Sequence, residues 1–314
     1  MADEVSAAAS EPEQVPAERN RESRGAAAWR EIKGILWVLV AVLLFHSFIA
    51  KPFYIPSESM MPVLLKGDRL VVTKYPYGWS YVSPTIPNPV AMFRSVVLRT
   101  GESWVASLPE WDGRVLGNMP ERGDIVIATP PGRREDYIKR VIGLPGDTIE
   151  VRAGQLLING RAVPRQRRPD RVIPIDENMQ CGMDPLQPDP DMMRLVTRGP
   201  EGQPLCRVPI VRETLPNGVS YDTIELGRSH GDDYSAVRIP AGHVFLMGDN
   251  RDKSADSRFS LAEKGLGGPV PWENLGGRAE FITFSLDGTT SLVNPMTWFG
   301  ALRSGRAGTS LRGE

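Results

Sequence analysis

An apolar run near the beginning of the chain, "IKGILWVLVAVLLFHSFIA" at residues 32–50, constrains its fold most strongly. Its length is close to the roughly 20 residues that a helix needs to cross a bilayer. A cleavable signal peptide is the alternative. However, the run is long for such a segment, and cleavage after Ala50 would put bulky Phe48 where a small residue is required. We therefore expect one retained transmembrane anchor over residues 31–51.

Basic residues are distributed unevenly around this run. Residues 16–33 contain five of them, and residues 51–68 contain only Lys51 and Lys66. Because the more basic flank stays in the cytoplasm, we expect a single-pass protein of the cytoplasmic (inner) membrane whose remaining chain lies on the outer, periplasmic face. Residues 1–30 are rich in Ala, Glu, Ser and Pro and poor in large apolar residues, so they are predicted to be a disordered cytoplasmic segment.

The chain after the anchor has the composition of a loop-rich β protein. It holds most of the 28 prolines and 31 glycines, which argue against a helical bundle. Short β-like runs occur at 68–74, 123–129, 137–143, 147–152, 155–163 and 243–249, and "LINGRAV" carries the Asn-Gly signal of a tight hairpin. The net charge of −1 gives no electrostatic reason to expect nucleic acid.

Two stretches between these runs show no clear periodicity, at about 76–120 and 164–240. The first contains Trp79, Tyr81, Trp104 and Trp111, and the C-terminal tail at 286–314 contains "NPMTWFGALRSGR". Aromatic residues of this kind on an anchored domain suit contact with membrane lipid. Ordinary packing is the alternative for the insertion, and a frayed end is the alternative for the tail.

Cys181 and Cys206 are the only cysteines. An exported domain meets an oxidising compartment, where two thiols can pair. A disulfide between them is the expectation, and two buried free thiols are the alternative.

"PSESMMP" at residues 56–62 follows the anchor closely and holds Ser57 and Ser59 between two conformationally restricting prolines. Taken alone, it reads as a linker. If one serine is a nucleophile, it needs a base. The three histidines are poorly placed for this role: His46 lies in the anchor, His230 in a polar loop and His243 at the start of a strand-like run.

Lys139, in "DYIKRVIG", is the remaining candidate base. A lysine that faces apolar groups has its charged form disfavoured and can be neutral enough to accept a proton near pH 7 or 8. A solvated lysine on a strand edge is the alternative, and it is the commoner case.

"GDNRDKSADSR" at residues 248–258 follows the apolar run "HVFLM" and mixes acids, arginines and serines. Asp249, Asp252 and Asp256 offer oxygen ligands for calcium, but the loop lacks the spacing and the terminal glutamate of an EF-hand. A rigid, ion-paired loop that positions hydroxyl groups is the favoured interpretation.

Together these blocks resemble the bacterial type I signal peptidases, or leader peptidases, a serine-lysine dyad family. The resemblance rests on an anchor followed in order by "PSESMMPVLLKGD", "RGDIVIA", "DYIKRVIGLPGDTIEV", "LLING", "MGDNRDKSADSR" and "VPWENLGGRA". It covers most of the chain outside the two insertions. The order and number of the blocks make it very specific.

The resemblance implies roles for individual residues. It makes Ser59 the nucleophile and Lys139 the general base, places the hydroxyl of Ser57 beside the backbone N–H of Ser59 in the oxyanion hole, and makes Ser254 the serine that orients the lysine. The substrate pockets are expected to be lined by Phe53, Ile55, Pro56, Met60, Leu64, Tyr137 and Ile138. Structural support is expected from Asp249, Arg251, Asp256 and Arg258.

The function that the resemblance implies is acyl transfer. A membrane-anchored serine endopeptidase would remove signal peptides from exported preproteins after an Ala-X-Ala-type site, since shallow pockets exclude larger side chains. Neither a metal nor an organic cofactor is implied. Signal peptides and membrane lipid are the expected partners, together with contact to the secretion machinery as an open alternative.

The implied fold is mostly β: a folded antiparallel catalytic core with an inserted second β subdomain, behind one N-terminal transmembrane helix. We divide the core into residues 52–163, which include the insertion at about 76–120, and residues 241–285. The inserted subdomain is expected at 164–240.

Lys253 departs from the family pattern. It is expected to be solvated, and the alternative is that it points toward Lys139 and lowers the pKa of that amine.

Two other functions remain as alternatives. One is a catalytically silent, membrane-anchored binding or assembly protein of the same fold, against which the presence of Ser59, Lys139 and Ser254 argues. The other is a self-cleaving repressor-type protease with the same Ser/Lys logic, against which the anchor and the lack of a DNA-binding module argue.

Overall fold

The computed structural model describes residues 24–88, 90–91, 94–95, 105–106, 108–133, 135–291 and 294–312. The chain divides into two units, residues 1–42 and 43–314. The disorder expected for residues 1–23 and the position of Trp104 lie outside the described residues.

Helix α1 (Arg24–Phe48) contains the apolar run and begins seven residues before the expected start of the anchor. The segment Gly25–Phe48 has a mean hydropathy of 1.8 and is long and apolar enough to cross a membrane. The chain leaves the helix at Ile49 and enters strand β1 at Ala50. The indole N–H of Trp79 donates to the carbonyl of Phe48, which satisfies one of the carbonyls left free at a helix end (2.9 Å).

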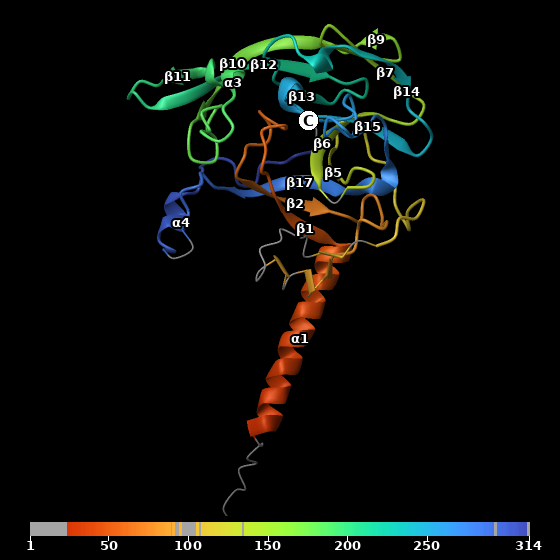
Figure 1. Cartoon of the computed structure of the whole chain (residues 1–314), viewed down its shortest axis with the longest axis vertical. Coiled ribbons are helices and arrows are strands. Elements are labelled where there is room, and N and C mark those ends of the chain that lie inside the picture. The colour runs from red at the N-terminus through yellow and green to blue at the C-terminus, as the bar shows by residue number, and fades with distance from the viewer. Residues whose placement is uncertain are drawn as a thin grey trace, which may run out of the picture. The chain divides into compact units, whose positions relative to one another are not determined.

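The rest of the chain is mostly antiparallel β structure around a strongly curled sheet (Figure 1). Its seven strands lie in the order β1 (Ala50–Tyr54), β2 (Asp68–Thr73), β17 (Leu275–Ser285), β5 (Ile125–Ala128), β6 (Tyr137–Gly143), β15 (His243–Met247) and β16 (Val270–Pro271). All of their pairings are antiparallel. Segments from both expected halves of the core therefore share one sheet.

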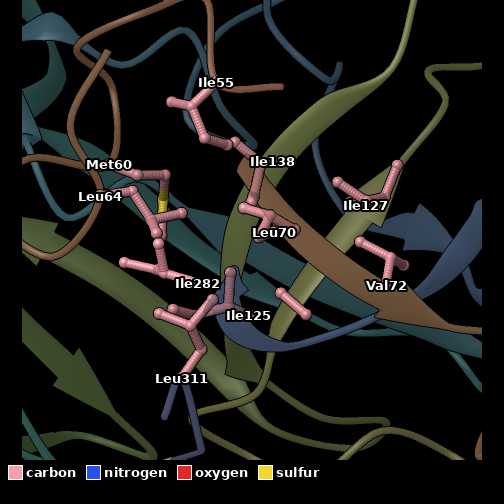
Figure 2. Close-up of a cluster of buried hydrophobic side chains, with 11 residues drawn as sticks. Ile55, Met60, Leu64, Leu70, Val72, Ile125, Ile127, Ile138, Ile282 and Leu311 are labelled. Carbon is pink, nitrogen blue, oxygen red and sulfur yellow. The ribbon is translucent and has the colours of Figure 1, made fainter. Parts of the chain in front are cut away.

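A buried apolar cluster fills one face of this sheet (Figure 2). Ile55, Met60 and Leu64 come from the segment between β1 and β2, and Ile138 comes from β6. Leu311 joins the same cluster, and its backbone N–H donates to the carbonyl of Glu280 in β17. The C-terminal tail is therefore packed against the sheet through residue 312, rather than frayed.

A second sheet is built from the region of the expected subdomain. It has the order β10 (Arg165–Pro174), β12 (Pro204–Thr214) and β11 (Val196–Arg198), with β13 (Ser220–Thr223) also paired to β12. Helix α3 (Pro190–Met193) precedes β11. Cys181 and Cys206 form a disulfide with their Cα atoms 5.8 Å apart, and both lie in a core with Met61 and Leu65. That core joins the second sheet to the segment just after Ser59.

A third sheet has the order β14 (Tyr234–Arg238), β7 (Thr148–Arg152), β8 (Gln155–Ile158) and β9 (Arg161–Ala162). The Asn-Gly hairpin prediction is confirmed, because Asn159 and Gly160 both have positive φ between β8 and β9. Strand β14 falls inside the range assigned to the subdomain but pairs with β7. The chain therefore returns to the catalytic core before residue 240.

The shorter elements complete the description. They are β3 (Ile86–Pro87), β4 (Val105–Ala106), α4 (Thr297–Gly300) and the 3-10 turns His230–Asp232, Arg251–Lys253 and Trp272–Asn274. In the first insertion, Trp79 packs against Phe48, and Tyr81 packs against Trp111 with ring centroids 6.0 Å apart. Phe299 in α4 is 80% exposed. Its contact with lipid stays a prediction.

Candidate active site

Ser59 lies in the turn that follows β1, and its side chain is almost buried, with 7% exposed. Two backbone hydrogen bonds in this segment, from Met61 to Glu58 and from Leu64 to Met60, fold it tightly. The carbonyl of Ser59 also accepts a bond from the N–H of Asn250 (3.1 Å). The turn is therefore held from outside by the loop that follows β15.

Lys139 reaches this turn from β6. Its Nζ lies 3.0 Å from Oγ of Ser59 and 2.9 Å from the carbonyl oxygen of Ile138. The side chain is 4% exposed. Its neighbour Ile138 packs with Ile55 and Met60 in a buried apolar cluster (Figure 2).

This burial changes the protonation of the amine. Loss of hydration lowers the pKa of Lys139 from its usual 10.5 to about 8, although Asp256 and Asp249 act in the opposite direction. A substantial fraction of the amine is therefore neutral near pH 8. The alternative interpretation, a solvated lysine on a strand edge, does not fit this burial.

Ser57 is exposed, and its Oγ lies 3.3 Å from Oγ of Ser59. The exposed hydroxyl of Ser57 therefore lies next to the hydroxyl of Ser59. Such a donor can stabilise negative charge that develops on a carbonyl oxygen.

Ser254 lies nearby, but it does not make the expected hydrogen bond to Lys139. Its Oγ is buried and has no partner among the described residues. The amine of Lys139 bonds instead to Ser59 and to the backbone of Ile138. A Cβ added to Gly248 would lie 2.2 Å from Oγ of Ser254 and 2.5 Å from the carbonyl oxygen of Ser59. Ser254 therefore packs beside the turn that carries Ser59, and an orienting role for it remains a prediction.

The residues expected to line the pockets are only partly gathered in one place. Ile55, Met60, Leu64 and Ile138 share the buried cluster, and Phe53 packs against it. Tyr137 packs with a different cluster, and its hydroxyl donates to the carbonyl of Lys264 (2.9 Å). Its ring still lies 5.5 Å from the amine of Lys139. Pro56 is exposed.

The charged loop at 248–258 is braced by buried ion pairs. Asp249 accepts two hydrogen bonds from Arg140, both 2.7 Å long. Asp256 accepts two from the guanidinium of Arg258, both 2.9 Å long, and two more from the backbone N–H groups of Gly248 (3.0 Å) and Arg258 (3.1 Å). These geometries satisfy the buried charges on both sides of the loop.

Arg251 is paired with a residue that sequence reasoning missed. Its guanidinium forms a two-pronged ion pair with Glu213 of β12, and both side chains are buried. The hydroxyl of Tyr221 also donates to Glu213 (2.9 Å). Arg140 was missed as well, although it directly follows Lys139. Arg140 could have been found from its position next to the candidate base, whereas no nearby feature of the sequence points to Glu213.

The other charged side chains of the loop are also engaged. Lys253 was expected to be solvated, but its Nζ lies 2.8 Å from a carboxylate oxygen of Asp189, just before α3. Oδ2 of Asp252 accepts from the backbone N–H of Leu226, and Asp249 and Asp256 face arginines. The three aspartates considered as calcium ligands therefore do not converge on one point.

The histidines are not paired with Ser59. His230 is exposed beside Glu263, and Nδ1 of His243 lies 2.9 Å from the carbonyl oxygen of Ala241. His46 is in α1. Among the described side chains, the amine of Lys139 is the basic group within hydrogen-bond distance of Oγ of Ser59.

Proteins that are similar to this chain are signal peptidases. The family described as "Signal peptidase, peptidase S26" matches residues 28–284. Signal peptidase I of Rickettsia bellii is 31% identical over 280 residues, which cover 87% of this chain and 78% of the relative. Signal peptidase I of Rickettsia prowazekii is 31% identical over 264 residues, which cover 82% of this chain and 80% of the relative.

The solved structure of a signal peptidase I from Enterococcus faecalis is 23% identical to this chain. The match covers 51% of this chain and 97% of that one, with a TM-score of 0.26.

Proposed function

Because this chain belongs to the signal peptidase family, peptidase S26, we propose that it cleaves signal peptides from exported preproteins with Ser59 as nucleophile and Lys139 as general base. Family membership makes it a serine endopeptidase. The observation that carries the specific proposal is the 3.0 Å separation of the two side chains, both of which are buried.

The mechanism follows from the positions of these groups. The neutral amine of Lys139 removes the proton of Ser59, and the Ser59 oxygen attacks the carbonyl carbon of the scissile bond. The hydroxyl of Ser57 and the backbone N–H of Ser59 stabilise the oxyanion. The ammonium of Lys139 then protonates the leaving amine. A water molecule, deprotonated by the same lysine, releases the acyl group from Ser59.

The sheet topology supports the binding of an extended peptide. Strand β1 is an edge strand, and the first three residues of β6 pair with β5 but not with β15. Both segments run toward the nucleophile turn, so a substrate strand can lie between them and use their free backbone groups. Ile55, Met60 and Ile138 would form the wall against side chains −1 and −3, and a tightly packed wall rejects bulky groups.

We also propose that α1 anchors the protein in the cytoplasmic membrane, with its N-terminus inside and its catalytic unit on the outer face. The family and the apolar helix support a membrane-anchored protein. The excess of basic residues before the helix supports this orientation. Membrane lipid and the secretion machinery remain proposed partners.

The test uses the full chain purified in a non-ionic detergent and a preprotein with Ala at −1 and −3. Mass spectrometry of the products should show one new N-terminus, immediately after the −1 residue. A matched preprotein with Leu at −1 should be cleaved at least a hundredfold more slowly. Efficient cleavage after Leu would contradict the proposed pockets, and absence of any cleavage would favour the catalytically silent alternative.

A further inference from the structure

A cavity of about 340 Å³ lies next to the proposed substrate path. Lys51 and Phe53 of β1 form part of its lining, together with Lys74 after β2, Thr129 after β5 and Asp136 before β6. Phe53 also packs against the buried cluster beside the nucleophile turn. The cavity therefore continues the path away from Ser59, and it is much larger than an alanine side chain.

The alternation of side chains along β1 connects the two regions. Lys51 and Phe53 are half-buried, whereas Pro52 and Tyr54 between and after them are exposed. Ile55 is buried in the cluster. Because successive side chains of a strand point to opposite faces, Lys51, Phe53 and Ile55 follow one face from the cavity toward the nucleophile turn.

An extended substrate beside β1 has the same two-residue period. Its side chains at −1, −3 and −5 therefore face one way. If −1 lies at the level of Ile55 and −3 at the level of Phe53, then −5 lies at the level of Lys51, inside the cavity. We infer that this cavity is a subsite for the −5 side chain, and that Lys51 and Lys74 make it prefer an acidic side chain over a basic one. This inference rests on the proposed function.

The charges around the cavity support this preference. The amine of Lys74 is buried and donates to the carbonyl of Ser83, and the amine of Lys51 lies over the ring of Phe53. Neither lysine forms a salt bridge with another described residue. Burial, and then the positive charge of Lys51, lower the pKa of Lys74 to about 8, while Asp136 opposes them weakly. The two amines therefore repel each other, and a carboxylate between them would relieve the repulsion.

Three other charged side chains line the cavity. Asp136 accepts a hydrogen bond from Thr129 (2.8 Å), and Glu110 is exposed. The guanidinium of Arg133 is bound to the carbonyl of Leu261. The lining therefore holds three basic groups against two acidic ones and keeps a net positive charge, which favours an acidic −5 side chain.

The test measures kcat/KM of the full chain in a non-ionic detergent at low salt. The substrates are preproteins with Ala at −1 and −3 that differ only at −5, which is Glu, Gln or Lys. We expect the Glu substrate to exceed the Lys substrate about tenfold, with the ratio falling as salt rises. Lys51→Gln should reduce the ratio to about threefold or less, and Lys51→Glu should invert it.

Two controls isolate the effect. The same Glu and Lys substitutions at −4, where the side chain faces the other way, should differ less than twofold. Arg161→Gln, which removes a positive charge from the exposed β8–β9 hairpin of another sheet, should retain the full −5 ratio.

The outcomes separate this inference from the proposed function. If the Gln substrate is cleaved normally but Glu and Lys at −5 are equivalent, the subsite is wrong and the proposed function stands. If the Gln substrate is not cleaved at all, the proposed function fails. If Lys51→Gln changes only the response of the activity to phosphatidylglycerol vesicles, the cavity binds a lipid phosphate and the inference is overturned.

Discussion

The amine of Lys139 lies 3.0 Å from the hydroxyl of Ser59, although the two residues are 80 positions apart in the sequence. Strand β6 brings the lysine to the turn after β1, and the loop after β15 holds that turn by its carbonyl. The pair therefore depends on three separate segments of the catalytic core.

The first prediction concerns this pair. Ser59→Ala and Lys139→Ala should each lower kcat/KM at least a thousandfold, because the first removes the nucleophile and the second removes its base. Circular dichroism should show an unchanged fold in both variants. Ser310→Ala, at an exposed serine, should keep full activity. Substantial turnover by a folded Ser59→Ala or Lys139→Ala variant would remove the dyad from the mechanism.

The second prediction concerns the pH dependence of cleavage. With a pKa of about 8, Lys139 is protonated below that pH and cannot accept the proton of Ser59. The acidic limb of kcat/KM should therefore titrate near pH 8 with a slope of one. Lys139→Arg should be inactive, because guanidinium stays protonated. A limb near pH 6.5 that disappeared on replacement of His230 or His243 would indicate a histidine base instead.

The third prediction concerns Gly248, which has no room for a side chain. A Cβ there would overlap Oγ of Ser254 and the carbonyl oxygen of Ser59. Gly248→Ala should therefore shift the nucleophile turn and reduce kcat about a hundredfold, since small displacements of reacting groups have large effects on rate. Gly227→Ala, where a Cβ meets nothing within 4 Å, is the matched control. Equal kcat values for the two variants would show that this packing does not position Ser59.

Ser254→Ala distinguishes two roles for this neighbour of Gly248. If Ser254 orients Lys139 during the reaction, kcat should fall while the fold is kept. If it only fills space beside Gly248, kcat should stay within about twofold of the wild-type value.

The fourth prediction concerns the buried ion pair between Glu213 and Arg251. Glu213→Ala leaves the charge of Arg251 buried without its partner, which should reduce the free energy of unfolding by about 3 to 5 kcal/mol. Denaturant unfolding measures this loss. Arg194→Ala, which breaks an exposed pair with Asp191, should cost less than about 1 kcal/mol. Similar losses in the two variants would mean that the buried pair does not brace the loop.

Much of the site could be predicted because its chemistry lies in short, continuous motifs. Ser57 and Ser59 share one turn, and Lys139 lies in a strand-like run, although the run alone favoured a solvated lysine and its burial is visible only in the fold. The mostly β fold and the Asn159-Gly160 hairpin follow from local signals of the same kind. Periodicity and turn chemistry act over a few residues, so they are visible in the sequence.

The parts that sequence reasoning missed depend on contacts between distant segments. Glu213 lies in an insertion without clear periodicity, and only the folded chain places it against Arg251. Strand β14 leaves that insertion to pair with β7, which no local pattern indicates. Lys253 was expected in solvent. Its partner Asp189 is 64 residues away, and no local pattern connects the two.

The last prediction is that the buried amine of Lys139 lowers the stability of the fold. The pKa of Lys139 falls from 10.5 to about 8 on folding. Below pH 8 the amine is protonated in both states and the full penalty applies, up to about 3 kcal/mol. Between pH 8 and 10.5 the unfolded chain binds more protons, so stability rises with pH in this window.

Lys139→Met removes the buried charge at the expense of the hydrogen bonds to Ser59 and Ile138, which contribute about 1 kcal/mol each. The variant should therefore be inactive but about 1 kcal/mol more stable than the wild type at pH 7. This advantage should be lost by about pH 9 and reversed at pH 10, because the wild-type amine is then neutral in the folded state and most of the penalty has gone. Denaturant unfolding at pH 7 and pH 10 measures the difference, with Lys264→Met as the control. A variant that is less stable than the wild type at pH 7, or a stability advantage that is independent of pH, would show that burial does not disfavour the charged form of Lys139.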